Sequence, residues 1–460
     1  MHNIGATVVV ISTPPGKGGV ALIRLSGEDA FIIADRVFRP RFGNTPLSQR
    51  APREQIFGDI FYDGERIDDG LATRFVAPNS FTGENTVEVS CHGGVLVARS
   101  VLEAFLANGA LAAEGGEFTR RAFLNGKLTL TEAESIGDLL EAKSFNAVRL
   151  SSSDSRSKLT QALDDLRKKL ISLMSSIFAR IDYPDEDLGD FTDEQSLTIL
   201  HSVREELLGL LATYKTGRAI RDGIRTVIAG KPNVGKSSLY NAMVGEDSAI
   251  VTEIEGTTRD VLERTVPFGR VTLCLADTAG LRNTADPVEQ IGVARSRGRI
   301  ADAELLLAVF DGSRPLCDED HELISLAKSC TCPVICVVNK ADMQINIDKN
   351  ELSKCFEHII TLSAKDGDIR PLSELVDRLF TDEALVIGES AILSSARQVG
   401  ALLHVREILD SAIAAYEMGL SADCAASDVE RAIGALGEVD GKAVSDEIVA
   451  DIFSKFCVGK

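Results

Sequence analysis

The sequence predicts a multidomain chain with a small α+β domain at the N-terminus, a helical domain, and an α/β domain inserted into the helical one. Short apolar runs alternate with Gly/Pro turns over residues 1–120, which is typical of a small α+β domain. Apolar residues recur at helical spacing on both sides of residues 224–380, and strand-like runs alternate with helix-length segments inside that range. Because the ends of a domain usually lie close together, an α/β insertion in one helical domain is the simplest arrangement.

Length and composition agree with this organisation. The 460 residues correspond to about three domains at roughly 150 residues each. Hydrophobic residues make up 44% and charged residues 26%, which excludes a mostly disordered chain. The net charge is −20, so nucleic acid is expected to bind only through a local basic face.

The sequence favours a cytoplasmic protein without a membrane span. Its nine cysteines lack zinc-ribbon spacing, and reduced thiols fit best. The N-terminus lacks the pattern of a signal peptide, and no apolar run approaches the roughly 18 residues needed to cross a bilayer.

The individual elements follow from periodicity. In the N-terminal domain we expect strands at 7–11, 20–25 and 86–90. Helices are expected over 131–216, broken at 183–185, with apolar stripes that are assigned to helix packing. These stripes are formed by Leu159, Leu163, Leu166, Leu170, Leu173 and Ile177, by Leu200, Val203, Leu207 and Leu210, and by Val399, Leu402, Leu409, Ile413 and Tyr416. The predicted domains are therefore 1–120, 121–223 together with 381–460, and 224–380.

A phosphate-binding motif follows the first strand of the inserted domain. Residues 226–229 are strand-like, and GKPNVGKS at 230–237 satisfies GxxxxGK[ST] in the required strand-to-helix setting. The glycines let backbone amides turn toward phosphates, Lys236 reaches the terminal phosphates, and the Ser237 hydroxyl can hold Mg²⁺. The nucleotide contacts expected here are Asn233, Val234, Gly235, Lys236, Ser237 and Ser238.

Four further strands, expected at 271–276, 305–310, 334–338 and 359–362, end in polar residues at the same crevice. The expected nucleotide contacts there are Asp277, Thr278, Ala279 and Gly280, then Asn339, Lys340 and Asp342, then Ser363, Ala364 and Lys365. The third strand ends at Asp311. The Asp342 carboxylate can accept two N–H bonds from guanine, whereas adenine offers no matching donor pair. The sequence therefore predicts a GTP site.

The segment between these motifs predicts a switch loop. Gly256–Asp260 lies in a polar stretch, where Thr258 could ligate Mg²⁺ only while the terminal phosphate is present; the alternative is an ordinary Ser/Thr-rich turn. Leu281 stands where Ras-like GTPases place the glutamine that orients the attacking water. The nearest substitutes are Arg282, Asp286, Glu289 and Gln290, although spacing alone favours a solvated surface position for each of them.

Distinctive motifs are found from the first expected strand to the last residue. They are TPPGKGGVALIRLSG (13–27), NSFTGE (79–84), HGG (92–94), GEFTRRAFLNGKL (116–128), GKPNVGKSS, GTTRD, DTAGLR, NKAD and the terminal FCVGK (456–460). With these motifs the chain resembles the tRNA-uridine-modification GTPase family (MnmE/TrmE). The resemblance implies a folate-binding, dimerising N-terminal domain, a helical domain and an inserted P-loop G domain.

The resemblance further implies site residues. Glu289 would be catalytic, and a potassium ion would be held by Asn233, Thr252, Ile254 and Thr257, with Thr252 and Thr257 also at the nucleotide. Magnesium would be held by Ser237 and Thr258. Formyl-tetrahydrofolate would contact Arg24, Glu88, Lys127 and Lys460, and Cys457 corresponds to the cysteine of the C-terminal motif.

The family activity implied is GTP hydrolysis coupled to tRNA modification. It involves a homodimer and a flavin-dependent MnmG/GidA-type partner in a hetero-oligomer, which install an aminomethyl-type group on carbon five of the wobble uridine. One alternative is a ribosome-assembly GTPase acting as a binding switch, but residues 381–460 contain six Lys/Arg against fourteen Asp/Glu, which disfavours a basic RNA-binding appendage. Another is a folate-dependent transferase with a regulatory G domain, which shares the same sites.

Three other features have structural interpretations from the residues alone. Residues 14–19 resemble half of a phosphate loop and are interpreted as a turn. His92 has no ligand partner at metal spacing and is interpreted as a hydrogen-bonded structural histidine. Cys457 has no His/Asp pattern nearby, so a small buried residue is favoured over a nucleophile.

Overall fold

The computed structural model describes residues 5–182, 192–245, 264–275, 302–420, 422–441, 449 and 452–453. The chain divides into two compact units, an N-terminal unit (Met1–Gly137 with Glu430–Lys460) and a central unit (Asp138–Val429). Within the described part of the chain, no helix has the length and apolarity required to cross a membrane.

The N-terminal unit is built on a seven-stranded sheet in the order β3-β4-β5-β6-β2-β1-β7, antiparallel except for the β1·β7 pair. Its strands are β1 (Val8–Ile11), β2 (Val20–Ser26), β3 (Phe38–Pro40), β4 (Gln55–Tyr62), β5 (Glu65–Phe75), β6 (Thr86–His92) and β7 (Leu111–Ala112). Alternate residues of β2, Ala21, Ile23 and Leu25, are buried in the core, which also receives helices α1 (Ala30–Val37) and α2 (Val95–Ala107). A short 3₁₀ turn, η1 (Leu47–Gln49), adds Leu47 to that core.

The C-terminal segment returns to this unit. Helix α3 (Glu117–Leu124) and the start of α4 (Leu130–Glu141) pack against Phe453, whose ring lies 6.1 Å from that of Phe123. The Thr131 hydroxyl donates to the backbone carbonyl of Val439 at 3.1 Å. Two segments that are 308 residues apart at the Thr131–Val439 bond therefore complete one core.

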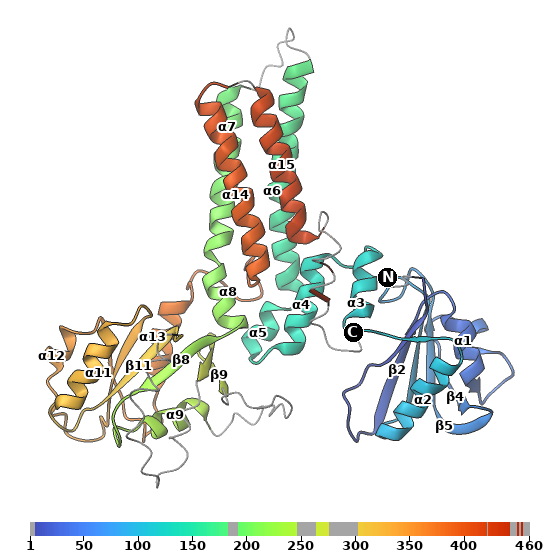
Figure 1. Ribbon diagram of the computed structural model, residues 1–460, viewed down its shortest axis with the longest axis horizontal. Coiled ribbons are helices and arrows are strands. Elements are labelled where there is room, and N and C mark those ends of the chain that lie inside the picture. Colours follow the sequence, from blue (N-terminus) through green and yellow to red (C-terminus); the bar gives the residue numbers. More distant parts are fainter. Residues whose placement is uncertain are drawn as a thin grey trace. The chain divides into compact units, whose positions relative to one another are not determined.

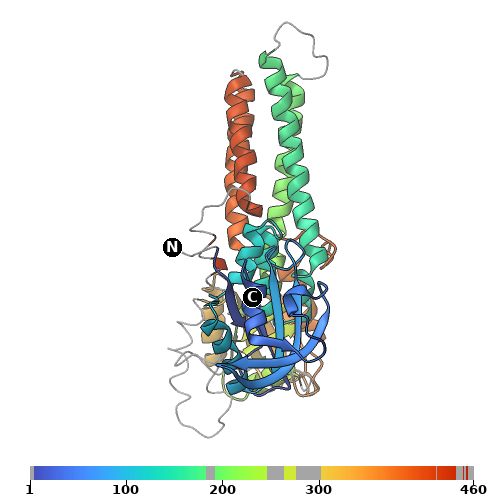
Figure 2. The ribbon, with the colours of Figure 1, turned by 90° about the vertical axis from the view of Figure 1, so that its right-hand side faces the viewer.

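The helical part of the central unit is held by the predicted apolar stripes. Its helices are α5 (Phe145–Leu150), α6 (Ser153–Asp182), α7 (Asp193–Ala212), α8 (Tyr214–Arg221) and α14 (Ala396–Glu417), and α15 (Ala422–Asp440) crosses from this unit into the other. Helix α7 packs against both α6 and α14, and the three run alongside one another in both views (Figure 1, Figure 2). The stripe residues of α6 and α7 are buried. The predicted break at 183–185 lies outside the described residues, directly after α6 ends.

The α/β part of the central unit has a six-stranded sheet in the order β13-β12-β11-β8-β10-β9. Its strands are β8 (Ile224–Ala229), β9 (Arg264–Phe268), β10 (Val271–Leu275), β11 (Leu305–Asp311), β12 (Val334–Asn339) and β13 (His358–Thr361). Its helices are α9 (Lys236–Val244), α11 (Asp318–Lys328), α12 (Lys349–Ser353) and α13 (Arg370–Phe380).

Both faces of this sheet are covered. Leu305, Leu307 and Val309 of β11 share a core with α9 and α13, whereas the alternate residues Leu306, Ala308 and Phe310 share one with α11 and α12. Helices on both faces explain the continuous apolar runs of the sequence. The fold class is confirmed.

One strand of this otherwise parallel sheet is antiparallel. Strand β9 pairs antiparallel with β10, with Phe268 opposite Val271. Only Gly269 and Arg270 lie between the two strands, and Gly269 has a φ of +59°. A two-residue connection joins antiparallel neighbours, because a parallel pair requires a crossover of about a dozen residues or more.

Candidate functional site

The phosphate-binding loop lies between β8 and α9. Asn233 and Gly235 adopt left-handed backbone conformations, with φ of +63° and +96°. A Cβ at Gly230 would lie 2.5 Å from the carbonyl oxygen of Val309, so the loop passes close to β11 at this glycine. The loop ends at the N-terminus of α9, where backbone N–H groups favour anions. Its backbone can therefore surround phosphate oxygens.

Lys236 begins α9, and its ammonium donates to the backbone carbonyl of Lys231 at 2.8 Å. This bond holds the lysine over the loop that it is expected to serve. Ser237 and Ser238 follow in the first turn of α9. The Ser237 hydroxyl is thus located at the position from which a P-loop serine binds Mg²⁺.

Asn339 connects the phosphate loop to the predicted guanine loop. This residue ends β12 and is 2% exposed. Its side-chain Nδ2 donates to the carbonyl of Val234 at 2.8 Å, and its Oδ1 accepts from the Ala364 amide at 2.9 Å. The buried Asn339 amide is therefore hydrogen-bonded to the phosphate loop and to the predicted guanine loop, and it fixes the distance between them.

Two side chains beyond Asn339 are also held in place. Ser363 donates to Oδ1 of Asp342 at 3.0 Å. Lys340, at a φ of +66°, directs its ammonium to Oδ2 of Asp311 at 2.7 Å. Burial raises the pKa of the Asp311 carboxyl, but the bonds from Lys340 and Ser313 outweigh burial and lower that pKa overall. The structure thus brings together Asp342, Ser363 and Ala364, with the exposed Lys365 next in the chain.

Several predicted residues lie outside the described residues. They are Thr252, Ile254, Thr257 and Thr258 of the switch loop, Asp277, Thr278, Ala279 and Gly280 after β10, the catalytic candidate Glu289 with its alternatives Arg282, Asp286 and Gln290, and Cys457 and Lys460 at the C-terminus. Their roles remain predictions.

A separate hollow in the N-terminal unit contains two of the four predicted folate contacts. Arg24 and Glu88 are directly opposite in the β2·β6 register, and Arg24 Nε donates to Glu88 Oε1 at 2.7 Å. With Phe75, Phe81, Thr86 and Phe118 they line a space of about 70 Å³. An aromatic wall with one cation and one anion suits a flat polar ring.

Lys127 lies near this hollow without lining it. Its ammonium donates to the carbonyl of Pro78 at 3.1 Å. Pro78 belongs to the same loop as Phe81, which lines the hollow. The structure therefore places three of the four predicted folate residues in one region of the N-terminal unit.

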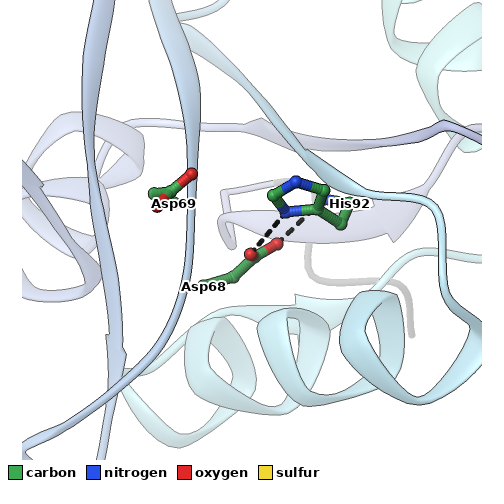
Figure 3. A group of neighbouring side chains, drawn as sticks. All are labelled: Asp68, Asp69 and His92. Carbon is green, nitrogen blue, oxygen red and sulfur yellow. Dashed lines mark hydrogen bonds and ion pairs between the residues drawn. The ribbon is translucent and has the colours of Figure 1, made fainter.

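His92 is hydrogen-bonded, as its interpretation predicted. Its Nδ1 lies 2.7 Å from Oδ1 of Asp68, and its backbone N–H donates to the other oxygen of that carboxylate (Figure 3). The bond to Asp68 raises the pKa of the His92 imidazole. Asp69 lies close enough to share a metal ion with this pair, but it is already paired with Arg41 and Arg66. Two guanidinium groups disfavour a cation there.

The neighbouring turn is also tied down by backbone bonds. The Gly18 amide donates to the Gly93 carbonyl at 2.9 Å, and the Gly93 amide donates to Gly19 at 3.3 Å. These bonds anchor residues 14–19 to the end of β6, in agreement with the interpretation as a structural turn.

Two features of the nucleotide site were missed from the sequence. The motif NKAD suggested that Asn339 and Lys340 touch nucleotide, but gave no indication that Asn339 bridges two loops or that Lys340 pairs with Asp311. The position of Asp311 at the end of a neighbouring parallel strand was the available signal. The second feature is Lys231, whose side chain contacts α11.

The phosphate loop before α9, the parallel strands beside it and the guanine-loop residues beyond β12 define a P-loop GTPase. Two family descriptions match the chain, the GTP-binding protein TrmE N-terminus over residues 7–127 and the MnmE helical domain over residues 130–457. The tRNA modification GTPase MnmE of Symbiobacterium thermophilum is 42% identical over 461 residues, which cover 99% of each chain.

Two further relatives align as completely. The tRNA modification GTPases MnmE of Lacticaseibacillus paracasei and Thermotoga maritima are each 39% identical over 459 residues, covering 99% of this chain and 98% and 100% of theirs. The chain belongs to the MnmE family of tRNA modification GTPases.

Proposed function

We propose that this chain is a cytoplasmic, potassium-dependent, dimerising GTPase that acts on tRNA. Together with a flavin-dependent MnmG/GidA-type partner, it would install an aminomethyl-type group on carbon five of the wobble uridine. The observation that carries the proposal is the alignment over 98–100% of relatives named as tRNA modification GTPases. An isolated G domain would not align with their N-terminal and helical parts.

The phosphate loop supports the nucleotide part of the proposal. Turned amides and the N-terminus of α9 would bind the phosphates, and Lys236 would exchange the Lys231 carbonyl for a phosphate oxygen. Ser237 and Thr258 would hold Mg²⁺, which neutralises phosphate charge. Asp342 would accept two N–H bonds from guanine, with Ser363 orienting its carboxylate.

Hydrolysis needs a group to position water, since Leu281 cannot. We assign this role to Glu289. Its replacement by alanine should lower the hydrolysis rate by about 10²–10³-fold and change nucleotide binding little. Lys236→Ala should instead damage binding. A normal hydrolysis rate in Glu289→Ala would exclude this residue.

A monovalent cation is proposed to neutralise charge on the transferring phosphoryl group, where many GTPases use an arginine finger. Asn233 sits in the phosphate loop and carries an amide oxygen of the neutral kind such a cation needs. Thr252, Ile254 and Thr257 would add switch-loop oxygens. Hydrolysis should be much faster in potassium than in sodium, and G domains should pair when potassium and a transition-state mimic are both present. Equal rates at matched ionic strength would contradict the proposal.

The hollow lined by Arg24 of β2 and Glu88 of β6 is proposed to bind formyl-tetrahydrofolate. Glu88 would accept pterin N–H bonds, whereas Arg24, Lys127 and Lys460 would be available to a ring carbonyl or a glutamate carboxylate. The Arg24–Glu88 pair and the surrounding phenylalanines support this assignment. Titration of the full-length chain with the folate should show binding at high micromolar ligand or below, and no binding would count against the site.

The decisive experiment for the whole proposal is nucleoside analysis by mass spectrometry. Transfer RNA from cells lacking this protein should lose the wobble-uridine modification, and the intact gene should restore it. An Asp342→Asn copy should restore it poorly. An unchanged wobble uridine in the deletion strain would refute the proposal and favour the ribosome-assembly alternative.

A further inference from the structure

A lysine in the phosphate loop points its ammonium at a cysteine on a different element. Lys231 is the second residue of the loop, yet its side chain is 8% exposed and packs on the first turn of α11. Its Nζ lies 3.0 Å from Oδ2 of Asp320 and 2.6 Å from Sγ of Cys317. A cation, an anion and a sulfur thus meet at one point beside the nucleotide site.

Cys317 occupies the N-cap of α11. Its backbone N–H donates to Oδ2 of Asp320 at 3.1 Å, and its carbonyl accepts from the Asp320 amide at 2.9 Å. The positive end of the α11 dipole and the Lys231 ammonium both create positive potential at the sulfur. Cys317 is partly exposed, so a small oxidant can reach the sulfur while its contact with the Lys231 ammonium is kept.

Four other cysteines of the described chain, Cys91, Cys330, Cys332 and Cys336, are less suited to oxidation. Cys91 and Cys336 are buried, and burial raises the pKa of each thiol to about 12. Burial also raises the pKa of Cys330 and of Cys332. Because the thiolate is the nucleophile, these four sulfurs should react slowly.

We propose that Cys317 and Lys231 are a peroxide-sensitive pair that forms a covalent S–N bond, a sulfenamide, tying the phosphate loop to α11 and weakening GTP binding. The bond would be made between Sγ and Nζ, which already touch. Its oxidant is hydrogen peroxide, and thiols reverse it.

The chemistry balances in two steps. First, the Cys317 thiolate attacks one oxygen of hydrogen peroxide, the O–O bond breaks and hydroxide leaves, so that sulfur is oxidised to a sulfenic acid as peroxide is reduced. Lys231 then gives a proton to Asp320, and its amine attacks the sulfur. The S–O bond breaks, and the departing hydroxide takes the second proton from nitrogen. Asp320 returns its proton to the first hydroxide, so the products are the sulfenamide and two waters.

Sulfenic acids condense with a backbone nitrogen to give a sulfenamide, and the deprotonated Lys231 amine is a stronger nucleophile than a backbone amide. The contact between Sγ and Nζ supplies the proximity that makes the second step effectively unimolecular. A thiol reverses the link by attacking the sulfur and releasing the amine.

The S–N bond would weaken GTP binding through two contacts of Lys231. The Lys231 carbonyl is the acceptor for Lys236, so moving Lys231 moves the lysine that must reach phosphate. Conversion of the ammonium to a neutral nitrogen also leaves the carboxylate of Asp320, which is 5% exposed, without its cation. An uncompensated buried charge is costly, so the loop should shift away from its binding conformation.

The test uses the full-length protein, treated with hydrogen peroxide and then freed of it. Peptides containing Lys231 and Cys317 should be recovered as a linked pair that has lost two hydrogens. Affinity for GTP, measured by calorimetry, should fall by about tenfold or more and should recover on addition of dithiothreitol.

Two variants make the result specific. Cys317→Ser retains an N-cap oxygen that can accept from Lys231, and should keep its GTP affinity after peroxide. Cys424→Ser removes an exposed cysteine on α15 and should respond as the unaltered protein does. The proposal is overturned if Cys317→Ser loses as much affinity as the unaltered chain. A linked pair that retains a peroxide oxygen, or an oxidised Cys317 without a link, also overturns it. Neither readout involves tRNA, so the outcome is independent of the proposed modification activity.

Discussion

Asp342 is the residue on which the choice of base is expected to depend. Its carboxylate is oriented by the Ser363 hydroxyl at 3.0 Å. Asp342→Asn should weaken GTP binding by about 1.5–3 kcal/mol for each hydrogen bond lost from a charged acceptor, or about tenfold per 1.4 kcal/mol. Affinity should shift toward xanthosine nucleotides, which present an acceptor where guanine presents an amine. Calorimetry with both nucleotides measures the shift.

A matched carboxylate separates base recognition from general charge effects. Asp368 is paired with Arg370 at 2.8 Å, and hydrogen bonds from Arg370 lower the pKa of its carboxyl to about 2. Asp368→Asn removes the same charge from the same domain and should leave GTP affinity unchanged. Equal effects of the two substitutions would contradict the assignment of Asp342.

The His92–Asp68 pair predicts a pH dependence whose sign can be worked out. The hydrogen bond to Asp68 raises the pKa of the His92 imidazole. The stabilisation from this pair is therefore fully present below the ordinary histidine pKa and is lost as pH rises through the higher folded value. NMR titration should show a His92 pKa above the ordinary value, and Asp68→Asn should return it toward that value.

Asp69→Asn serves as the control for His92. Asp69 is the next residue on β5, but it is paired with Arg41 and Arg66, and it contributes least among the causes that raise the His92 pKa. Its replacement should lower that pKa by less than Asp68→Asn does. A His92 titration that is indifferent to Asp68→Asn would show that the bond does not form in solution.

At the scale of elements, the strands of the inserted domain could be predicted closely because burial on both faces leaves an unbroken apolar run. The expected 305–310 and 334–338 became Leu305–Asp311 and Val334–Asn339. Strand β9 could not be recognised in the same way. Its run RTVPF contains Pro267 and lies at the edge of the sheet, where a proline is tolerated and burial is incomplete.

The residues of the nucleotide site could be predicted where they come directly after a strand. Glycines, Lys236 and Asp342 could be assigned because their spacing fixes them at one edge of a parallel sheet. The side-chain directions of Asn339 and Lys231 could not be predicted, because they depend on partners elsewhere in the sequence. The Asn339 side chain is fixed by Val234 and Ala364. The Lys231 side chain is fixed by Cys317 and Asp320.

The turn that begins α9 makes a further prediction. Gly235 has a φ of +96°, and a Cβ there would lie 2.1 Å from Nδ2 of Asn339. A left-handed non-glycine residue costs roughly 1–2 kcal/mol, and Asn339 cannot retreat without losing its bonds to both loops. Gly235→Ala should therefore reduce GTP affinity about tenfold or more, measured by calorimetry.

Gly419→Ala is the control for this glycine. Gly419 has a φ of +68° at the end of α14, with nothing within 4 Å of an added Cβ. Its replacement incurs the backbone cost alone and should leave GTP affinity intact. If Gly235→Ala binds GTP as well as Gly419→Ala does, the contact with Asn339 is unimportant.

For the molecule as a whole, α8 joins the inserted domain to the helices. Ile220 is fully buried, and its carbonyl accepts from the Thr272 hydroxyl of β10 at 3.2 Å. The Thr216 hydroxyl accepts from the Asp382 amide at 3.0 Å, just beyond α13. A Cβ at Gly217 would lie 2.0 Å from the Leu393 carbonyl. The entering and leaving segments of the insertion therefore meet on one helix.

These contacts of α8 predict that the inserted domain is more stable as an isolated fragment when α8 is included. A fragment of residues 214–393 should resist urea better than one of residues 224–380, by about 3 kcal/mol or more, because it retains a buried isoleucine and two hydrogen bonds. In the full chain, Thr216→Val should lower the unfolding free energy, whereas Thr198→Val, at an exposed position of α7, should not. Equal stability of the two fragments would show that α8 belongs to the helical bundle alone.

The same insertion has a consequence for the order in which a new chain folds. Helix α7, whose buried residues include Leu200, Val203, Leu207 and Leu210, packs against α6 and also against α14, which begins only at Ala396. Residues 213–395 must leave the ribosome first, and at about 5–20 residues per second this takes on the order of 10–40 s. During that interval the side of α7 that contacts α14 is exposed, in every nascent chain, to chaperones and to other unfinished copies. Rapid folding of the inserted domain shortens neither this delay nor the exposure, because the missing helix is encoded after it.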